Sequence, residues 1–326
     1  MRIVLAEPLL YDYLPQLERA TRDRHDWHLA ENLDASVVAD AEVLVASGLS
    51  SDLAAAAKRL RLVHAPGAGY EAIALDALPR GVLVANTFHH GRSIAEHVVM
   101  VTLALTRDLR GTDSDLRADR WRSPRYVREA VRPATLRGRT LGVIGLGEIG
   151  SETARMASAF GMRTIAVRRH AGRTPPDGVA LDWVGGIDDL PRLCAEADVV
   201  VVTVPLSAET TGLIGAPELA AMGPGTLLVN VARGPVVDED ALYTALVERR
   251  IGGAALDVWW HYPDEAGHGS PASRPFADLD NVLLTPHVSG VTTETFTRRV
   301  ADIAGNIDRL AAGDPLVNVV HGGDDG

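Results

Sequence analysis

The first part of the chain alternates short apolar runs with alanine-rich segments. The apolar runs are rich in valine, leucine and isoleucine and span residues 2–6, 42–46, 62–65 and 82–85. Between two of them, residues 51–60 have the spacing and composition of a helix. This alternation predicts βα units that build a parallel sheet.

A second series of apolar runs follows residue 139. It predicts strands over residues 140–145, 164–168, 198–204, 226–231, 254–258 and 282–285. Residues 199–202 are four consecutive valines, and a continuously apolar run is typical of a strand that helices cover on both faces. We therefore predict an α/β protein with doubly wound parallel sheets.

Two long helices are expected outside these series. Residues 93–110 predict one helix between the two series, and a polar, arginine-rich stretch that continues to residue 139 is expected to form a connector and an arm. Residues 292–312 predict the other helix, which Gly313 ends. Its apolar stripe consists of Phe296, Val300, Ile303, Ile307 and Leu310.

The length, composition and net charge of the chain limit the kinds of molecule that it is expected to bind. The 326 residues suffice for two domains, and an apolar fraction of 46% excludes a long disordered chain. The net charge of −11 gives no reason to expect binding to nucleic acid or to an anionic membrane surface. The longest apolar stretch, residues 94–105, is too short to span a membrane. We expect a small-molecule partner.

The cysteine content bears on the compartment. Cys194 is the only cysteine, so an internal disulfide and a zinc cluster of thiolates are both excluded, and we expect no metal site. The apolar run at the N-terminus is too short for the core of a signal peptide. A cytoplasmic location is expected.

A glycine pattern stands between a predicted strand and a predicted helix that extends to residue 160. It reads Gly145-Leu146-Gly147-Glu148-Ile149-Gly150. In such a pattern the first glycine permits a tight turn, the second lets a pyrophosphate approach the backbone, and the third lets the helix pack on the strand. We predict a dinucleotide site with Gly145, Gly147, Glu148, Ile149 and Gly150 among its contacts.

The next predicted strand ends with two arginines. An acidic residue at this place would bind the ribose 2′-hydroxyl of NAD, whereas arginine can pair with a 2′-phosphate. Arg168 and Arg169 stand there, followed by His170. NADP(H) is therefore the predicted cofactor and NAD(H) the alternative. Simple solvation of both guanidinium groups at a loop edge stays open.

Two further side chains that could take part in catalysis follow predicted strands. Arg233 comes directly after the strand over residues 226–231, and His287 follows the strand over residues 282–285. Ligands of open α/β sheets bind at the carboxyl ends of strands. There a guanidinium could bind a carboxylate and an imidazole could transfer a proton to or from a hydroxyl, so we predict a small anionic substrate. The alternatives are an ordinary surface arginine and an ordinary histidine.

Several ordered motifs resemble one family along nearly the whole chain. They are Ala65-Pro66-Gly67-Ala68-Gly69-Tyr70, Ser93-Ile94-Ala95-Glu96-His97, the glycine pattern, residues 230–242, Leu256-Asp257-Val258 and Pro286-His287. The sequence resembles the D-isomer-specific 2-hydroxyacid dehydrogenases. The resemblance implies a Rossmann dinucleotide-binding domain with a dimerisation arm, residues 96–291, inserted into a flavodoxin-like substrate domain of residues 1–95 and 292–326. It also implies a homodimer.

The resemblance further implies roles for individual residues. Arg233 would bind the substrate and His287 would donate the proton for carbonyl reduction. The expected substrate contacts are Ala68, Gly69, Tyr70, His90 and Trp259, the first two through backbone N–H groups. Further expected cofactor contacts are Val204, Pro205, Val231, Ala232 and Asp257.

One position departs from the family pattern. The family usually has an acid that hydrogen-bonds the catalytic histidine, and here Tyr262 stands in its place before Pro263. Tyr262 is therefore the third candidate catalytic residue. Alternatively, Asp264 or Glu265 could reach His287, or catalysis could be impaired.

Three functions remain in view. The preferred prediction is hydride transfer between NADP(H) and a small 2-oxo acid or D-2-hydroxy acid, as in a glyoxylate/hydroxypyruvate reductase. Oxidation of formate or phosphite is an alternative, because the formate dehydrogenase branch also lacks the acid. However, His90 occupies the position of that branch's formate-binding asparagine. The third possibility is a catalytically impaired, cofactor-binding regulatory protein.

Overall fold

The computed structural model describes residues 1–130, 132–264 and 266–322. Glu265, one of the alternative partners of His287, and residues 323–326 of the expected substrate domain lie outside this range. The chain divides into two compact units. Unit 1 comprises Met1–His89 and Val291–Gly326, and unit 2 comprises His90–Gly290.

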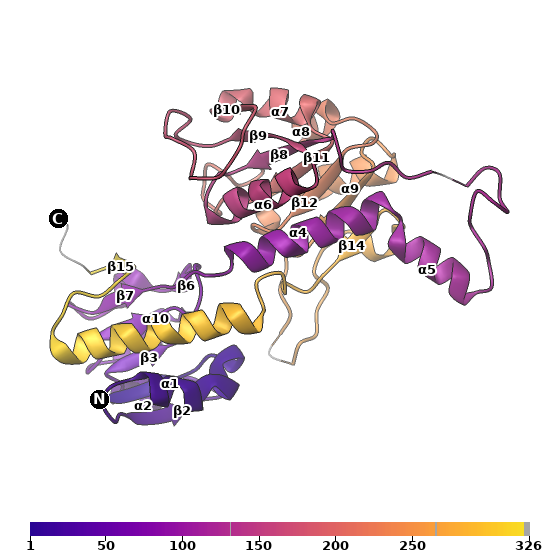
Figure 1. The fold of residues 1–326 in the computed structure, drawn as a ribbon. Helices are drawn as coiled ribbons and strands as arrows, with labels where there is room; N and C mark the ends of the chain where they lie inside the picture. The colour runs from indigo at the N-terminus through magenta and orange to yellow at the C-terminus, as the bar shows by residue number, and fades with distance from the viewer. Residues whose placement is uncertain (131, 265, 323–326) are drawn as a thin grey trace. The chain divides into compact units, whose positions relative to one another are not determined.

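Unit 1 contains a six-stranded sheet in the order β15-β7-β5-β3-β1-β2 (Figure 1). Its strands are β1 (Arg2–Leu5), β2 (Asp26–Leu29), β3 (Val43–Val45), β5 (Leu62–His64), β7 (Leu83–Ala85) and β15 (Val319–His321). All neighbours pair in parallel except β15, which runs antiparallel to β7. The parallel strands have the order 2-1-3-4-5 of a flavodoxin-like sheet. β4 (Gly48–Leu49) and β6 (Ala72–Ile73) form a separate parallel pair.

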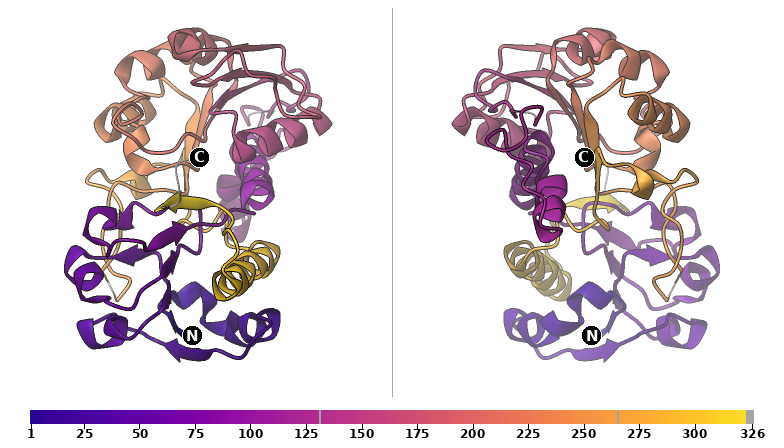
Figure 2. Two further views of the ribbon diagram at one scale, coloured as in Figure 1. Left: turned by 90° about the vertical axis from the view of Figure 1, so that its left-hand side faces the viewer. Right: turned by 90° about the vertical axis from the view of Figure 1, so that its right-hand side faces the viewer.

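Helices cover both faces of the unit 1 sheet. They are α1 (Leu14–Ala20), α2 (Ala35–Ala39), α3 (Ser51–Ala56) and α10 (Thr293–Ala312). The apolar stripe of α10 packs with α1 on one face, and α2 and α3 contribute to the core on the other (Figure 2). Thr292 caps α10 by accepting a hydrogen bond from the N–H of Thr295, and Gly313 ends the helix at φ +78°. Sequence and structure therefore agree on this helix.

Unit 2 contains a seven-stranded, all-parallel sheet in the order β10-β9-β8-β11-β12-β13-β14. Its strands are β8 (Thr140–Ile144), β9 (Arg163–Val167), β10 (Trp183–Gly185), β11 (Val199–Val202), β12 (Leu227–Asn230), β13 (Gly253–Leu256) and β14 (Val282–Leu284). This is the Rossmann order, in which the winding reverses between β8 and β11. The predicted α/β fold with doubly wound sheets is confirmed.

The helices of unit 2 also pack on both faces of their sheet. They are α4 (Gly91–Thr106), α6 (Glu148–Ala159), α7 (Leu190–Glu196), α8 (Ala216–Ala221) and α9 (Glu239–Val247), whereas α5 (Leu109–Arg117) follows α4 and buries none of its residues. α4 and α6 build the core on one face, and α7, α8 and α9 build it on the other. All four valines of β11 are buried, as expected for a strand between two helical layers.

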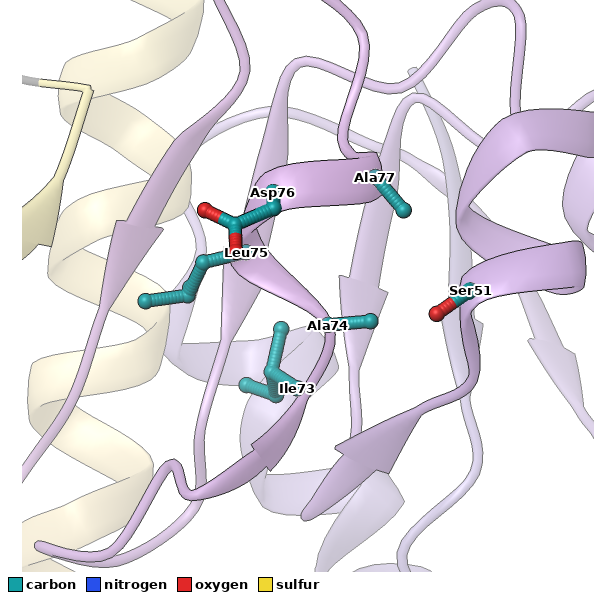
Figure 3. Close-up of a pocket in the computed structure, with 6 residues that line it drawn as sticks. All are labelled: Ser51, Ile73, Ala74, Leu75, Asp76 and Ala77. Carbon is teal, nitrogen blue, oxygen red and sulfur yellow. The ribbon is translucent and has the colours of Figure 1, made fainter.

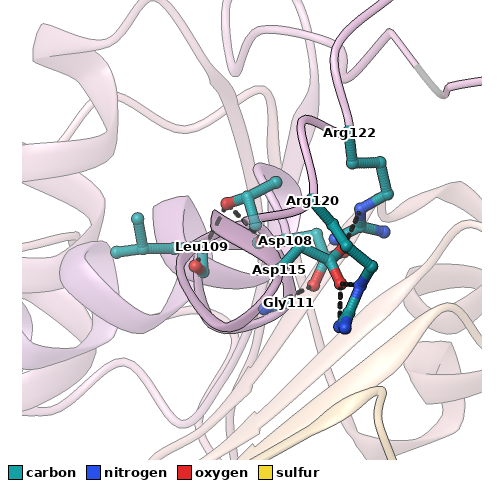
Figure 4. A network of polar contacts seen from close by, with 7 residues as sticks. Asp108, Leu109, Gly111, Asp115, Arg120 and Arg122 are labelled. Atoms are coloured by element: carbon teal, nitrogen blue, oxygen red, sulfur yellow. Dashed lines mark hydrogen bonds and ion pairs between the residues drawn. The ribbon is translucent and has the colours of Figure 1, made fainter. Parts of the chain in front are cut away.

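The expected single helix over residues 93–110 is wrong, because the structure has two helices there. The break falls at Asp108, which adopts a left-handed conformation with φ +45° and caps α5 through the N–H of Gly111. Arg122 pairs with both Asp108 and Asp115, and Arg120 also pairs with Asp115 (Figure 4). These ion pairs hold the segment after α5 against the start of the helix.

The sequence pattern missed five short strands, namely β2, β10 and β15 at the edges of the two large sheets and β4 and β6 of the separate pair. β2 and β10 are edge strands, and their sequences Asp26-Trp27-His28-Leu29 and Trp183-Val184-Gly185 lack a run of β-branched residues. An edge strand needs fewer apolar side chains because it packs against a neighbour on one side only. Among the described helices, none combines the length and apolar character needed to cross a membrane.

Candidate active site

The glycine pattern forms a tight turn between β8 and α6, at the point where the winding of the unit 2 sheet reverses. Gly145 has φ +98°, and a side chain there would collide with Val204. A Cβ on Gly150 would stand 2.1 Å from the carbonyl oxygen of Gly145, so only glycine lets the helix begin this close to the turn. In contrast, a Cβ on Gly147 would meet no atom within 4 Å. The middle glycine therefore leaves its backbone open to a ligand.

A cavity of about 720 Å³ lies beside this turn. Its wall includes Gly145 and Gly147 from the turn, Arg168 and Arg169 after β9, and Val204 and Pro205 after β11, together with Ile144, Leu146, Val167, His170, Arg173, Ile187, Thr203, Glu209, Thr210 and Leu213. The volume lies within the range of ligand sites. The cavity also stands at the N-terminus of α6, where free N–H groups and the helix dipole favour phosphate. These features fit a dinucleotide.

The two arginines in the cavity wall differ in their surroundings. Arg169 is exposed and forms an ion pair with Glu209 at 2.7 Å. Arg168 is half-buried, and its Nη2 donates to the carbonyl oxygen of Ala171 at 3.4 Å. The buried Nε of Arg168 has no hydrogen-bond partner among the described residues. A buried donor without a partner is costly, so an anion at this place would relieve the cost.

Arg233 stands in a loop that a buried asparagine organises after β12. The side chain of Asn230 donates to the carbonyl oxygen of Arg233 at 3.0 Å and accepts from the N–H of Ala232 at 3.1 Å. Gly234 lies so close to the backbone of Trp259 that a Cβ would stand 2.2 Å from its carbonyl carbon. The sequence Asn-Val-Ala-Arg-Gly therefore brings Arg233 against the segment that follows β13.

His287 follows β14 and has an unusual backbone conformation, with φ +58°. The buried carboxylate of Asp257 supports this turn by accepting hydrogen bonds from the next two N–H groups, Val288 and Ser289, both at 2.9 Å. It also accepts from the hydroxyl of Thr285 at 2.6 Å. A left-handed histidine persists only where its surroundings hold it, and such residues concentrate at functional sites.

The phenol oxygen of Tyr262 lies 2.8 Å from Nδ1 of His287. This contact links the segment after β13 to the loop after β14. The Asp264 carboxylate instead accepts hydrogen bonds from the N–H groups of Ala266 and His268.

The charges around this pair act on both titrating groups. Burial lowers the pKa of His287, and the Arg233 guanidinium acts in the same direction while Asp257 opposes it. Burial raises the pKa of Tyr262, whereas a hydrogen bond from the Trp259 backbone and the charge of Arg233 act to lower it. A neutral imidazole and a neutral phenol therefore face one another at neutral pH.

The other candidate residues of unit 2 fall into two groups. Trp259 is buried and donates its indole N–H to the carbonyl oxygen of Thr285 at 3.0 Å, and His90 precedes α4 beside Gly290. The expected cofactor contacts that do not line the cavity are Glu148, Ile149 and Gly150 at the start of α6, Val231 and Ala232 after β12, and Asp257 after β13.

The candidate substrate residues Ala68, Gly69 and Tyr70 belong to unit 1, in the loop after β5. Asn86 holds this loop by donating to the carbonyl oxygen of Ala68 at 2.8 Å. The N–H groups of Ala68 and Gly69 form no hydrogen bond with another described residue. Two neighbouring N–H groups of this kind can bind an anion.

A separate hollow of about 460 Å³ in unit 1 offers less chemistry. It is lined by Ser51, Ile73, Ala74, Leu75, Asp76 and Ala77 (Figure 3). Its only hydroxyl and its only carboxylate, on Ser51 and Asp76, lie apart, so no polar groups converge on a ligand. No cluster of metal-binding side chains is found among the described residues.

Comparison with known proteins agrees with this geometry. Residues 99–289 match the model of the D-isomer specific 2-hydroxyacid dehydrogenase, NAD binding domain. The hydroxypyruvate reductase of Thermotoga maritima is 32% identical over 83% of this chain and 85% of its own length. The chain belongs to the D-isomer specific 2-hydroxyacid dehydrogenase family.

Other members of this dehydrogenase family extend the comparison. The D-3-phosphoglycerate dehydrogenase of Methanocaldococcus jannaschii is 32% identical over 98% of this chain, but the chain spans only 59% of that protein's length. The structure of an NADPH-dependent glyoxylate/hydroxypyruvate reductase from Sinorhizobium meliloti, in complex with NADP and malonate, has 30% identity and a TM-score of 0.78. It covers 98% of this chain and 97% of that one.

Sequence reasoning missed residues that support the site without carrying its charge. Asn230 organises the Arg233 loop, and Thr203 donates its hydroxyl to the carbonyl oxygen of Gly145 at 2.5 Å. Thr285 binds Asp257 below His287. Each stands at the carboxyl end of an apolar strand, and a polar residue at that position is the feature that could have indicated them.

Proposed function

We propose that the chain is an NADP(H)-preferring reductase that converts a small 2-oxo acid into the D-2-hydroxy acid. The observation that carries the proposal is the placement of Arg233, His287 and Tyr262 after neighbouring strands of the sheet whose reversal point holds the glycine turn. A hydride donor in the cavity and a proton donor at His287 are the two elements that carbonyl reduction requires.

The residues of unit 2 would hold NADP(H) at three places. The N–H groups at the start of α6 would face the pyrophosphate, and Arg168 would pair with the 2′-phosphate. Val204 and Pro205 supply the apolar wall of the cavity. When bound, the reduced nicotinamide supplies a hydride. NAD(H) would lose the charge-assisted bond to Arg168 but keep the other contacts.

The remaining residues would bind and protonate the substrate. The Arg233 guanidinium is suited to a substrate carboxylate and to polarising the adjacent carbonyl. His287 would deliver the proton to the carbonyl oxygen. In unit 1, which we propose as the substrate domain, the N–H groups of Ala68 and Gly69 are suited to bind an anion.

We also propose a homodimer that uses the arm of unit 2. The large apolar side chains Leu109, Leu116, Trp121 and Tyr126 on and after α5 are each more than half exposed. Exposed apolar groups at this density on one segment favour a protein interface. The ion pairs among Asp108, Asp115 and the two arginines would keep the arm ordered before it binds the second copy.

The test is a panel of 2-oxo acids, including glyoxylate and hydroxypyruvate, assayed with NADPH and with NADH by loss of nicotinamide absorbance. We expect turnover with at least one acid and a higher kcat/KM with NADPH. Formate and phosphite are assayed with NADP⁺ in the same series. Turnover with either of these and with no 2-oxo acid would replace the proposal by oxidation of a small anion.

A further inference from the structure

We propose that Tyr262 is a second proton carrier in the reduction. As hydride reaches the carbonyl carbon, Nε2 of neutral His287 releases its proton to the carbonyl oxygen, and the phenol proton of Tyr262 moves to Nδ1. The inference rests on the proposed function, because it needs a carbonyl that accepts hydride. It assigns to this chain a relay in place of a single imidazolium donor.

The starting point is the tautomer of the neutral ring. The Tyr262 oxygen and Nδ1 of His287 are 2.8 Å apart, so one hydrogen bond joins them. A phenol is a stronger acid than a neutral imidazole N–H, and an imidazole nitrogen is a stronger acceptor than a phenol oxygen. The phenol therefore donates, Nδ1 accepts, and the ring carries its proton on Nε2.

The surroundings favour the neutral ring before reaction. The charged or titratable groups that face His287 are Arg233 after β12, Asp257 after β13 and Tyr262 itself, and His97 of α4 approaches Thr285 at 3.5 Å. The Asp257 oxygens bind Thr285, Val288 and Ser289, so they support the loop and do not contact Nδ1. No carboxylate within the described residues holds a second proton on the ring.

Burial, the largest influence on Tyr262, and the charge of Asp257 raise the pKa of the phenol and oppose the phenolate that the relay creates, but two interactions offset part of this cost. Tyr262 receives a hydrogen bond from the Trp259 backbone, and the positive charge of Arg233 acts on its oxygen. Both interactions favour the ionised phenol. The Tyr262 side chain is 52% exposed, so water can return the proton after the product leaves.

The relay balances in atoms and charge. A C–H bond forms with the hydride of the reduced nicotinamide, which is oxidised, and the carbonyl π bond becomes an O–H bond with the proton from Nε2. The O–H bond of Tyr262 breaks and an N–H bond forms at Nδ1. The ring ends neutral with its proton on the other nitrogen, and the phenolate carries the negative charge.

A mechanism with a single imidazolium donor would give a different dependence of the reduction rate on pH. In that case reduction would decline as pH rises through the pKa of His287, which burial places below its ordinary value. In the relay, reduction continues above that pKa and declines only where Tyr262 loses its proton. The Tyr262→Phe variant removes the second carrier and should return the enzyme to the first behaviour.

The tautomer can be measured without turnover. Protein labelled with ¹⁵N-histidine, at a pH above the titration of His287, should show Nδ1 without a proton and Nε2 with one. The His287→Gln variant assigns the resonances. Tyr262→Phe should weaken this preference toward that of free histidine, whereas Tyr13→Phe, which retains its ring stack with Phe296, should leave it intact. A protonated Nδ1 in the unsubstituted protein would overturn the proposal.

Kinetics in mixtures of H₂O and D₂O show whether one proton or two protons move in the rate-limiting step. With NADPH and the best 2-oxo acid, the solvent isotope effect on kcat should vary non-linearly with the deuterium fraction, and Tyr262→Phe should make it linear. We expect this variant to lose about 10- to 100-fold in kcat with little change in KM, and its descending pH limb to move to lower pH. A linear dependence and an unchanged limb would reject the relay. Absence of turnover with every 2-oxo acid would reject the proposed function, and the tautomer would still be decided by the spectrum.

Discussion

The side-chain amide of Asn306 donates a hydrogen bond to Nε2 of the buried His64, at 3.1 Å. Because Nε2 accepts, the proton of the ring lies on Nδ1, which is 3.0 Å from the carbonyl oxygen of Ala65. Asn306 also bonds both backbone groups of Val317, each at 2.9 Å. Through this pair, β5, α10 and the segment before β15 share one polar network that requires a neutral histidine.

The stability of unit 1 should therefore decrease in mild acid. Burial lowers the pKa of His64 to about 4, from about 6.5 in an unfolded chain. Below pH 6.5 the unfolded state binds more protons, so the contribution of His64 is complete above that pH and is lost progressively as pH falls toward 4. The total is on the order of 3 kcal/mol. Urea unfolding from pH 4 to 7 measures it. His64→Gln should flatten this part of the curve, and an unchanged slope would contradict the assignment.

Replacement of Asp257 by asparagine should release the His287 loop. The amide can offer only one oxygen to the N–H groups of Val288 and Ser289, and its own N–H₂ group would face a donor. We expect a loss of about 2 to 3 kcal/mol in unfolding free energy and a large loss of turnover. The exposed Asp182→Asn serves as the matched control. Wild-type activity in Asp257→Asn would show that the loop does not depend on the carboxylate.

Substitution of Arg233 by lysine should separate substrate binding from cofactor binding. The charge remains, but the two-pronged contact to a carboxylate is lost. We expect kcat/KM for the 2-oxo acid to fall by about 10²- to 10³-fold, because the guanidinium stabilises charge that develops in the transition state. Calorimetric titration should give an unchanged Kd for NADPH. A weaker Kd with normal turnover would assign Arg233 to the cofactor instead.

The cofactor preference should depend on Arg168. Its Arg168→Asp variant places a carboxylate where the 2′-phosphate of NADPH would lie, and we expect the preference to move toward NADH by about one to two decades in affinity. The control is Arg163→Asp at the opposite end of β9, which pairs with Asp182 on the surface. If both variants bind the two cofactors alike, the arginine pair has no role in discrimination.

A charge on α5 should dissociate the dimer. Leu116 is 52% exposed, and Leu116→Asp would bury a carboxylate in the proposed interface, which is costly without a partner. Light scattering coupled to gel filtration should show the mass of one chain for this variant and of two for the unsubstituted protein. Val247→Asp, a 50% exposed position on α9, should leave the larger mass unchanged. A monomeric unsubstituted protein would refute the dimer.

Sequence pattern predicted the elements that apolar burial dictates. The valines of β11 and the apolar stripe of α10 are recognisable in the sequence because both elements bury these side chains. β2 escaped notice because an edge strand without β-branched residues has little apolar pattern. The break at Asp108 was not predicted either. It is accompanied by an ion pair between Asp108 and Arg122, and the sequence does not show that these two residues meet.

Some features of the candidate active site could likewise be predicted from the sequence, and others could not. Glycine spacing predicts the turn at Gly145 because its function depends on the absence of a side chain. Tyr262 could be named as the residue in the place of the usual acid, but its contact with Nδ1 of His287 depends on how two loops from different strands meet. Similarly, the support that Asn230 and Thr203 give to their loops follows from side-chain directions, which residue order does not specify.

Unit 1 is built from two separate segments of the chain, and this affects the order in which the protein folds during synthesis. α10 and β15, which complete the core and the sheet of unit 1, leave the ribosome only after all of unit 2. The first 89 residues must therefore wait with the face that α10 covers still open to solvent, while unit 2 is contiguous and can fold as soon as it emerges. Once unit 2 is folded, it shortens the effective loop between the two parts of unit 1 and lowers the entropy cost of joining them. Nascent chains should consequently acquire protease resistance in unit 2 first, and a chain that stops before α10 should expose the strands of unit 1 to aggregation.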